Sequence, residues 1–424
     1  MVFSFLKGEQ MKSNNLTAQQ VQHNPRRQFL KRSGLMLGGS LIGSGLSMSV
    51  AADNHHSVAE KHCLSDITYP FYGEHQQGII TPQQTYVYFL VLDLATESLD
   101  EVREVFKTWT TYAARLTQGK NVKEYAKNHF VPPADTGEAD DLSVYGLTLT
   151  FGVSPSFLQK LGLQDKAPKA LKDLPLFPRD QLKEEFSGGD ICIQSCANDA
   201  QVAFHAVRQL VRVARSNVTM KWSQAGFISA DKPTDTPRNL FGFKDGTANA
   251  NTVKDLDGQV WVDQPDWLKG GSYLIVRKIV MHLETWDRTS YKEQERTFGR
   301  HRISGAPIGE KEEFAPLDLD KLNHHGKPMI PDDSHSALAH KTGKQMLRRA
   351  YSYSDGINPR TGQFDSGLLF ICYQKDPEQF ITIQNALGNV DRLNEYITHI
   401  GSGLFACFGG VKEGEFIGQA LLGA

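Results

Sequence analysis

The pattern of hydrophobic and polar positions in the first half of the chain predicts strands and helices in a definite order. Four apolar or alternating runs are typical of strands, and two longer segments carry apolar residues at the spacing of a helix face. The strands are expected at 86–94, 147–154, 190–198 and 218–228, and the helices at 99–116 and 200–214. The order β-α-β-β-α-β is that of the ferredoxin-like unit, an antiparallel sheet with both helices on one face.

The second half repeats this order with a longer interruption. Strands are expected at 272–286, 346–354, 367–374 and 403–411, and helical segments at 291–298 and 377–387. We therefore expect an α+β fold of duplicated ferredoxin-like domains, with antiparallel β-sheets facing each other and the helices outside. The expected boundaries are 1–52 for a signal segment with an N-terminal extension, 53–228 for the first domain and 229–424 for the second.

Two irregular stretches interrupt these domains. A polar stretch at 163–187 is rich in Pro, Lys and Asp, and the segment between Gly299 and Lys344 has little periodic structure. Compact domains seldom contain so long a loop without a functional reason. We expect the second stretch to help build a site.

The N-terminal region has the parts of a signal peptide in the right order. The string Pro25-Arg26-Arg27-Gln28-Phe29-Leu30-Lys31 precedes a Gly- and Ser-rich apolar run at 35–50. Paired arginines before a large apolar pair match the twin-arginine (Tat) address, which an export machinery reads. The alternative is a chance basic cluster in a membrane anchor, but the run is short for crossing about 30 Å of hydrocarbon. We expect export to the periplasm in a folded state, with translation starting at Met1 or Met11.

Charge and cysteine content narrow the function classes. Cleavage after residue 52 would leave 40 Lys and Arg against 47 Asp and Glu. This acidic balance argues against a nucleic-acid partner. The five cysteines show no CxxC spacing, and three of them lie in apolar runs, so we expect buried thiols and no zinc site. These three are Cys192, Cys372 and Cys407.

The most specific string in the chain is the loop at 241–249, Phe-Gly-Phe-Lys-Asp-Gly-Thr-Ala-Asn, in which glycines flank one carboxylate. Taken alone, such a loop is an ordinary turn. Together with other strings, however, it resembles the dye-decolourising peroxidases, and within them the exported deferrochelatase branch. The other strings are WDRTSYKEQERTFGR at 286–300, GAPIG at 305–309, SHSALAH at 334–340, MLRRAYSYSDG at 346–356 and GLLFICYQKD at 367–376.

This resemblance implies one haem b per chain, with His335 as the iron ligand. It places Asp245 and Arg348 on the other, distal side of the haem as catalytic residues. A carboxylate can move a proton, and a guanidinium stays charged and can stabilise charge as the O–O bond of peroxide breaks. Arg349 is the rival for the second role. Asp391 matches the family's acid beside the iron ligand. The alternative interpretation is that Asp391 is an exposed carboxylate without a role.

The resemblance also implies where the haem propionates are held. The expected residues are Gly246, Thr247, Ala248, His340, Lys341 and Thr342. The chain departs from the family here, because relatives carry Arg where this chain has Ala337 and an Asn-Pro-Arg string further on. The segment before Arg348 is also shorter than in relatives. We therefore expect propionate recognition to differ from that of relatives.

The resulting hypothesis is a peroxidase that uses hydrogen peroxide to oxidise a small reductant, and that also acts on haem to release its iron. The expected partners are the Tat export machinery, an iron-uptake system and a second copy of the chain in a homodimer. Two alternatives are a non-catalytic exported haem carrier or sensor and a haem-free interaction module. Tyr351, Tyr353 and the tryptophans are either relays for electrons or core residues, and core packing is the default for large aromatic side chains.

Overall fold

The computed structural model describes residues 64–423 apart from 231, 233, 250–251 and 265. The expected signal segment, with its paired arginines, and Cys63 lie outside the described residues. Within the described part of the chain, no helix is long and apolar enough to cross a membrane.

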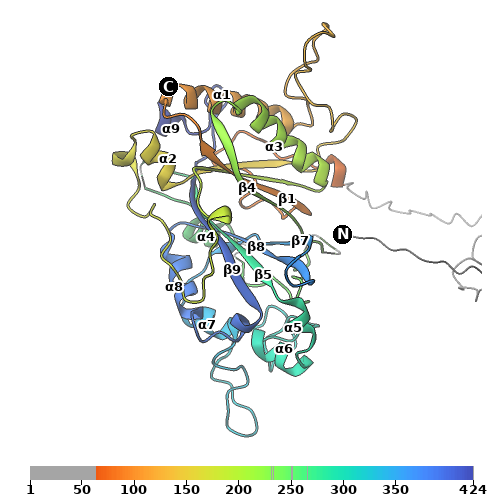
Figure 1. Cartoon of the computed structure of the whole chain (residues 1–424). Helices are drawn as coiled ribbons and strands as arrows, with labels where there is room; N and C mark the ends of the chain where they lie inside the picture. Colours follow the sequence, from red (N-terminus) through yellow and green to blue (C-terminus); the bar gives the residue numbers. More distant parts are fainter. Residues whose placement is uncertain (1–63, 231, 233, 250–251, 265, 424) are drawn as a thin grey trace, which may run out of the picture. The chain divides into compact units, whose positions relative to one another are not determined.

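Four strands of the first half form an antiparallel sheet in the order β2-β3-β1-β4. Helices α1 and α3 cover one face of this sheet (Figure 1). The strands are β1 (Tyr86–Leu94), β2 (Thr148–Val153), β3 (Ile191–Ala197) and β4 (Val218–Phe227), and the helices are α1 (Leu99–Leu116) and α3 (Ala200–Ala214). All six elements agree with the prediction from the sequence to within about two residues at each end.

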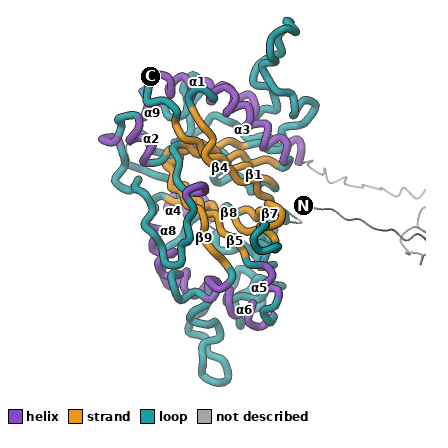
Figure 2. The backbone as a smooth tube through the Cα atoms, viewed as in Figure 1, coloured by secondary structure: helices purple, strands orange, loops and turns teal. Residues whose placement is uncertain are grey.

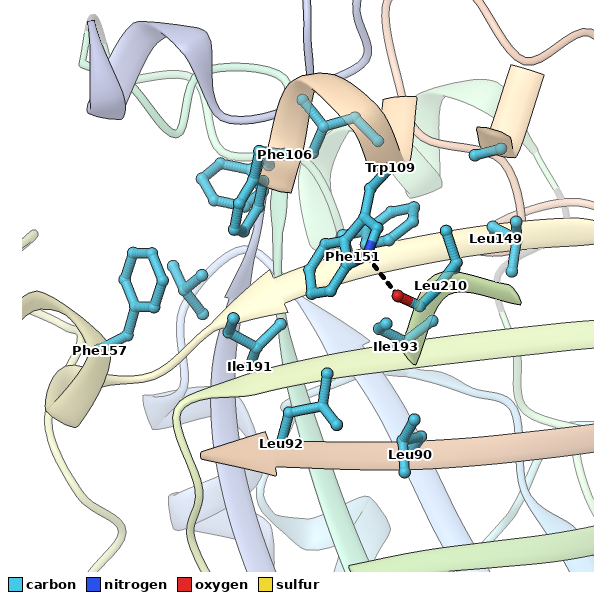
Figure 3. Close-up of a cluster of buried hydrophobic side chains, with 14 of the residues drawn as sticks. Leu90, Leu92, Phe106, Trp109, Leu149, Phe151, Phe157, Ile191, Ile193 and Leu210 are labelled. Carbon is cyan, nitrogen blue, oxygen red and sulfur yellow. Dashed lines mark hydrogen bonds between the residues drawn. The ribbon is translucent and has the colours of Figure 1, made fainter. Parts of the chain in front are cut away.

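The apolar stripes of the two helices explain why they dock here. Phe106 and Trp109 of α1 pack on side chains of the sheet that include Phe151 (Figure 3). The indole Nε1 of Trp109 donates to the carbonyl of Leu210 in α3 at 2.8 Å, so the one polar atom of this side chain is paired. Ser98 begins α1 by accepting a hydrogen bond from the backbone N–H of Glu101, as an N-cap does.

The second half forms another antiparallel sheet in the order β9-β5-β8-β7. Strand β6 pairs with β8 beside β7. The strands are β5 (Ser272–Met281), β6 (Leu347–Arg348), β7 (Tyr351–Ile357), β8 (Phe364–Gln374) and β9 (Ile397–Cys407). The helices of this half are α5 (Leu283–Asp287), α6 (Tyr291–Phe298), α7 (His335–Lys341) and α8 (Glu378–Leu387).

The two sheets face each other with helices outside, as predicted (Figure 2). Their inner faces share one apolar core, to which Phe89 and Trp222 come from the first sheet and Leu274 and Tyr373 from the second. Short pairings also join the sheet edges, β2 to β9 through Gly152 and β4 to β7 through Phe227. The duplicated ferredoxin-like fold is thereby confirmed, while the domain boundaries at 52 and 228 stay predictions.

Short elements complete the described chain. They are α2 (Pro155–Lys160), α4 (Val253–Gln259), α9 (Gln419–Leu422), and the 3-10 turns η2 (Leu64–Asp66), η3 (Gln164–Lys166), η4 (Glu184–Phe186) and η5 (Arg392–Glu395). Cys192, Cys372 and Cys407 are buried free thiols, as expected, and Cys196 joins them.

Three predictions of secondary structure in the second half were wrong in detail. The strand expected at 272–286 ends at Met281, and the chain turns into α5 because Trp286 packs on Phe241, with ring centroids 4.5 Å apart. The strand expected at 346–354 is split between β6 and β7. The last strand begins at Ile397 rather than 403.

Candidate active site

A cavity of about 430 Å³ lies against the outer face of the second sheet. Alternate residues of a strand point to opposite faces, so β8 sends Leu369 and Ile371 into the core between the sheets and Leu368 and Phe370 toward the cavity. Helices α7 and α8, the start of β9 and the 241–249 loop, which we call the distal loop, supply the other walls. The walls are mostly apolar with a few polar groups, as in cofactor sites.

His335 is the first residue of α7 and lies in the cavity wall. Its Nδ1 is 2.7 Å from Oδ2 of Asp391, a carboxylate whose side chain is only 2% exposed. Asp391 is itself fixed, because its Oδ1 accepts from the backbone N–H of Leu393 at 2.9 Å. An ionised carboxylate can only accept, so the proton of the imidazole is held on Nδ1 and Nε2 is left as the electron-pair donor.

Asp245 of the distal loop forms an ion pair with Nη2 of Arg348. The Asp245 side chain is 6% exposed, and its other oxygen lies 3.4 Å from the amide nitrogen of Asn239. Nε of Arg348 is buried without a partner among the described residues. The cavity therefore holds a carboxylate and a cation with unused hydrogen-bonding capacity.

Asn249 connects the distal loop to the strand that carries Arg348. Its Oδ1 accepts from the backbone N–H of Arg348 at 2.9 Å, and its Nδ2 donates to the carbonyl of the same residue at 2.7 Å. The side-chain amide thus pairs with Arg348 as a neighbouring strand would. This contact brings two segments about a hundred residues apart into one site.

Arg349 lies away from the cavity. It is 4% exposed and donates to the carbonyl oxygens of Thr81 at 2.6 Å and Pro82 at 3.3 Å, and to the side chain of Gln84. Arg348 and Arg349 therefore point to different sides, as expected for neighbours in a strand.

The structure brings most of the sequence-predicted site residues to this cavity. Lys341 and Thr342 are the exceptions, since the Lys341 ammonium pairs with Asp332 at 3.1 Å and the Thr342 hydroxyl donates to the Ala339 carbonyl at 2.7 Å. The residues that line the cavity are Asp245, Gly246, Thr247, Ala248, His335, His340, Arg348 and Asp391. Ala337 is fully buried in α7.

Sequence reasoning missed several polar residues of the cavity wall. Arg300 donates to the carbonyl of Gly305 at 2.8 Å, and burial lowers its pKa from the usual value. His399 is 7% exposed, and burial, followed by the charge of Arg277, lowers its pKa to about 3. Arg277 forms a buried ion pair with Asp180. Only Arg300 carried a signal, because it ends one of the strings that mark the family.

These observations fit a haem. An imidazole whose Nδ1 is held by a carboxylate presents Nε2 to a metal, which is the usual arrangement of iron-bound histidine. Apolar side chains such as Phe370, Leu368 and Ile383 suit a flat porphyrin, and the Asp245–Arg348 pair adds groups for peroxide chemistry.

Comparison with known proteins agrees with this site. The family models of the Dyp-type peroxidase N-terminal and C-terminal domains match residues 76–228 and 236–412. A deferrochelatase of Shigella sonnei is 40% identical over 422 residues, which cover 95% of this chain and 98% of that protein.

Solved structures give the same result. The DyP-type peroxidase of Streptomyces coelicolor has 37% sequence identity and a TM-score of 0.80, covering 85% of this chain and 98% of that one. An oxyferrous complex of DtpA from Streptomyces lividans has 37% identity and a TM-score of 0.79 at the same coverage. The chain therefore belongs to the Dyp-type peroxidase family and is a haem-dependent peroxidase.

Proposed function

We propose that His335 holds the haem iron through Nε2 and that Asp245 and Arg348 are the catalytic residues for hydrogen peroxide. The observation that carries this proposal is the convergence of the His335–Asp391 pair and the Asp245–Arg348 pair on one cavity. Haem, when bound, supplies the iron at which the O–O bond is broken and through which electrons pass from the reductant.

The two distal residues would have different roles: Asp245 would transfer a proton, and Arg348 would stabilise negative charge. The Asp245 carboxylate could take a proton from one oxygen of hydrogen peroxide and return it to the other oxygen, which would then leave as water. Arg348 keeps its charge throughout. Its Nε, which has no partner among the described residues, and its Nη groups can donate to the oxygen on which negative charge develops. Asp391 would fix the orientation of the His335 ring and strengthen its donation to the metal.

Basic groups of the cavity wall are proposed to bind the propionates. Lys244, Arg300, His340 and Lys344 supply positive or hydrogen-bonding groups there, together with Gly246, Thr247 and Ala248 of the distal loop. Lys341 and Thr342 would act through the end of α7 rather than by contact with the haem. This arrangement would replace the arginine that relatives carry at position 337.

A second activity is proposed on the same pocket. The name of the Shigella sonnei relative, deferrochelatase, supports release of iron from haem. We propose that this chain also accepts haem as a substrate in iron uptake. A carrier or sensor without catalysis is not favoured, because such a protein would need neither Asp245 nor Arg348.

The setting of this activity is proposed from the sequence and the family. The paired arginines at 26 and 27 support Tat export to the periplasm, and the relationship to deferrochelatases favours an exported protein. An iron-uptake system and a second copy of the chain in a homodimer remain proposed partners. The peroxidase itself takes hydrogen peroxide and an electron donor as substrates.

The test compares purified wild type with His335→Ala, Asp245→Asn and Arg348→Leu. We expect His335→Ala to lose the stoichiometric haem absorption band, and the other two to keep the band and lose peroxide-dependent oxidation of a dye. The exposed residue Asp320 provides a control, Asp320→Asn, which should match wild type. Wild-type turnover in Asp245→Asn and Arg348→Leu would refute the catalytic roles, and a normal haem band in His335→Ala would refute the ligand.

A further inference from the structure

Glu313 belongs to the irregular segment between Gly299 and Lys344, yet its carboxylate contacts the distal loop on both sides of Asp245. Oε2 pairs with the ammonium of Lys244, and Oε1 accepts from the hydroxyl of Thr247 at 3.0 Å. We propose that Glu313 is a positioning residue that holds the distal loop so that Asp245 stays paired with Arg348. This proposal rests on the catalytic role proposed for Asp245.

The distal loop needs such support because it belongs to no helix and no strand. The backbone N–H of Asp245 donates to the carbonyl of Pro237 at 2.8 Å, and Arg238 and Lys244 form an isolated bridge. Directly after Asp245, Gly246 has a φ of 117°, a backbone conformation that favours glycine. These main-chain hydrogen bonds are not those of a regular element, so side chains that fasten the neighbours of Asp245 also contribute to its position.

Glu313 is itself held firmly. Its side chain is 11% exposed, and Nη1 of Arg300 donates to its carbonyl oxygen at 3.2 Å. Burial pushes the pKa of Glu313 upward, but hydrogen bonds from Lys244, Thr236 and Thr247 outweigh burial and leave that pKa below the usual value. The carboxylate is therefore ionised at neutral pH, as the contact with a lysine requires.

A second contact from the same segment supports the arrangement. The backbone of Arg238 forms a β-bridge with that of Lys244 at the base of the distal loop. The Arg238 side chain donates from Nη2 to the carbonyl of Ile303 at 2.8 Å. Gly305 packs on the Lys244 side chain so closely that a Cβ there would lie 2.7 Å from Cδ. The segment between Gly299 and Lys344 thus contacts the distal loop and its base at several points. Among these contacts, those of Glu313 lie on both sides of Asp245.

Glu313 acts through other residues rather than on the substrate. Lys244, Asp245 and Thr247 line the cavity, whereas Glu313 lies behind them and is not part of the cavity wall. A displacement of about 1 Å in a catalytic group can cost about a hundredfold in rate. Loss of this carboxylate should therefore lower kcat while the affinity for a reductant that binds elsewhere changes little.

The experiment uses haem-loaded protein and three variants at one position. Glu313→Gln removes the charge at nearly constant shape, Glu313→Ala removes both contacts, and Glu313→Asp keeps the charge on a shorter side chain. The neighbouring exposed residue supplies the control, Glu312→Gln. Two experiments are made: hydrogen exchange of residues 236–249 is followed by mass spectrometry, and kcat and KM are determined for peroxide-dependent dye oxidation.

We expect faster exchange in 236–249 and a kcat lowered about tenfold to a hundredfold in Glu313→Gln and Glu313→Ala, with KM for the dye within about twofold. Glu313→Asp should partly restore the slow exchange and the kcat of wild type, and Glu312→Gln should equal wild type in both. Unchanged exchange in 236–249 in Glu313→Gln would overturn the proposal, and so would an equal rise of exchange over the whole chain. If Asp245→Asn retained full turnover, the catalytic role of Asp245 would fail, while the exchange result would still decide whether Glu313 holds the loop.

Discussion

Asp391 holds His335 through a single hydrogen bond, 2.7 Å between Oδ2 and Nδ1, from a position fifty-six residues further along the chain. His335 is the first residue of α7, Asp391 is the N-cap of η5, and the carboxylate is almost fully buried. Such a contact fixes the tautomer of the imidazole and makes Nε2 a stronger donor to a metal.

Asp391→Asn is therefore expected to weaken haem binding about tenfold to a hundredfold, because an amide holds the imidazole less strongly than a carboxylate. Haem titration followed by absorption measures this directly. Asp333→Asn is the matched control, since Asp333 pairs with Arg392 at 2.8 Å rather than with the imidazole. Equal affinity in Asp391→Asn and wild type would contradict the role assigned to this pair.

Replacement by leucine should affect turnover at Arg348 and folding stability at Arg349. Arg348→Leu is expected to abolish peroxide turnover with little change in melting temperature, because this side chain faces the cavity. Arg349→Leu leaves buried acceptors such as the Thr81 carbonyl without a donor, which costs about 1–3 kcal/mol for such a group. Thermal unfolding and turnover assays on both variants separate the two effects, and a reversed pattern would show that the assignment of the arginines is mistaken.

The melting temperature should depend on pH in the acid range through the contacts of Glu313. The pKa of Glu313 lies below its usual value of 4.5, so its contribution to stability is present above about pH 4.5 and is lost as the pH falls through the lower pKa. Glu313→Gln should remove this contribution. The melting temperatures of wild type and variant should therefore differ most at neutral pH and approach each other in acid, and a difference that grows in acid would contradict the sign.

Export should depend on the paired arginines. Replacement of Arg26 and Arg27 by lysine keeps the charge but changes the geometry of the side chains, which matters for recognition. We expect the haem-loaded protein to remain in the cytoplasm, as measured by haem absorption in periplasmic fractions. A control with Lys31→Arg should export normally. Undiminished export of the double variant would remove the Tat proposal and leave the peroxidase assignment in place.

The sequence predicted the first domain more accurately than the second. Elements such as α1 and β3 are continuous runs whose periodicity is set by burial on one face or on both. In the second domain, β5 stops at Met281 because Trp286 packs on Phe241, a contact between residues 45 positions apart. Local periodicity contains no information about such a partner.

By itself the sequence determined the order of elements, the duplicated fold, the family and the identities of His335, Asp245 and Arg348 as candidates. These follow from hydrophobic periodicity and from strings of neighbouring residues, which are local properties of the chain. Only the tertiary structure decided which side chains meet. It separated Arg348 from Arg349, turned Lys341 and Thr342 away from the cavity and placed Glu313 behind Asp245, because packing and the pairing of buried polar groups set distances between residues far apart in the sequence.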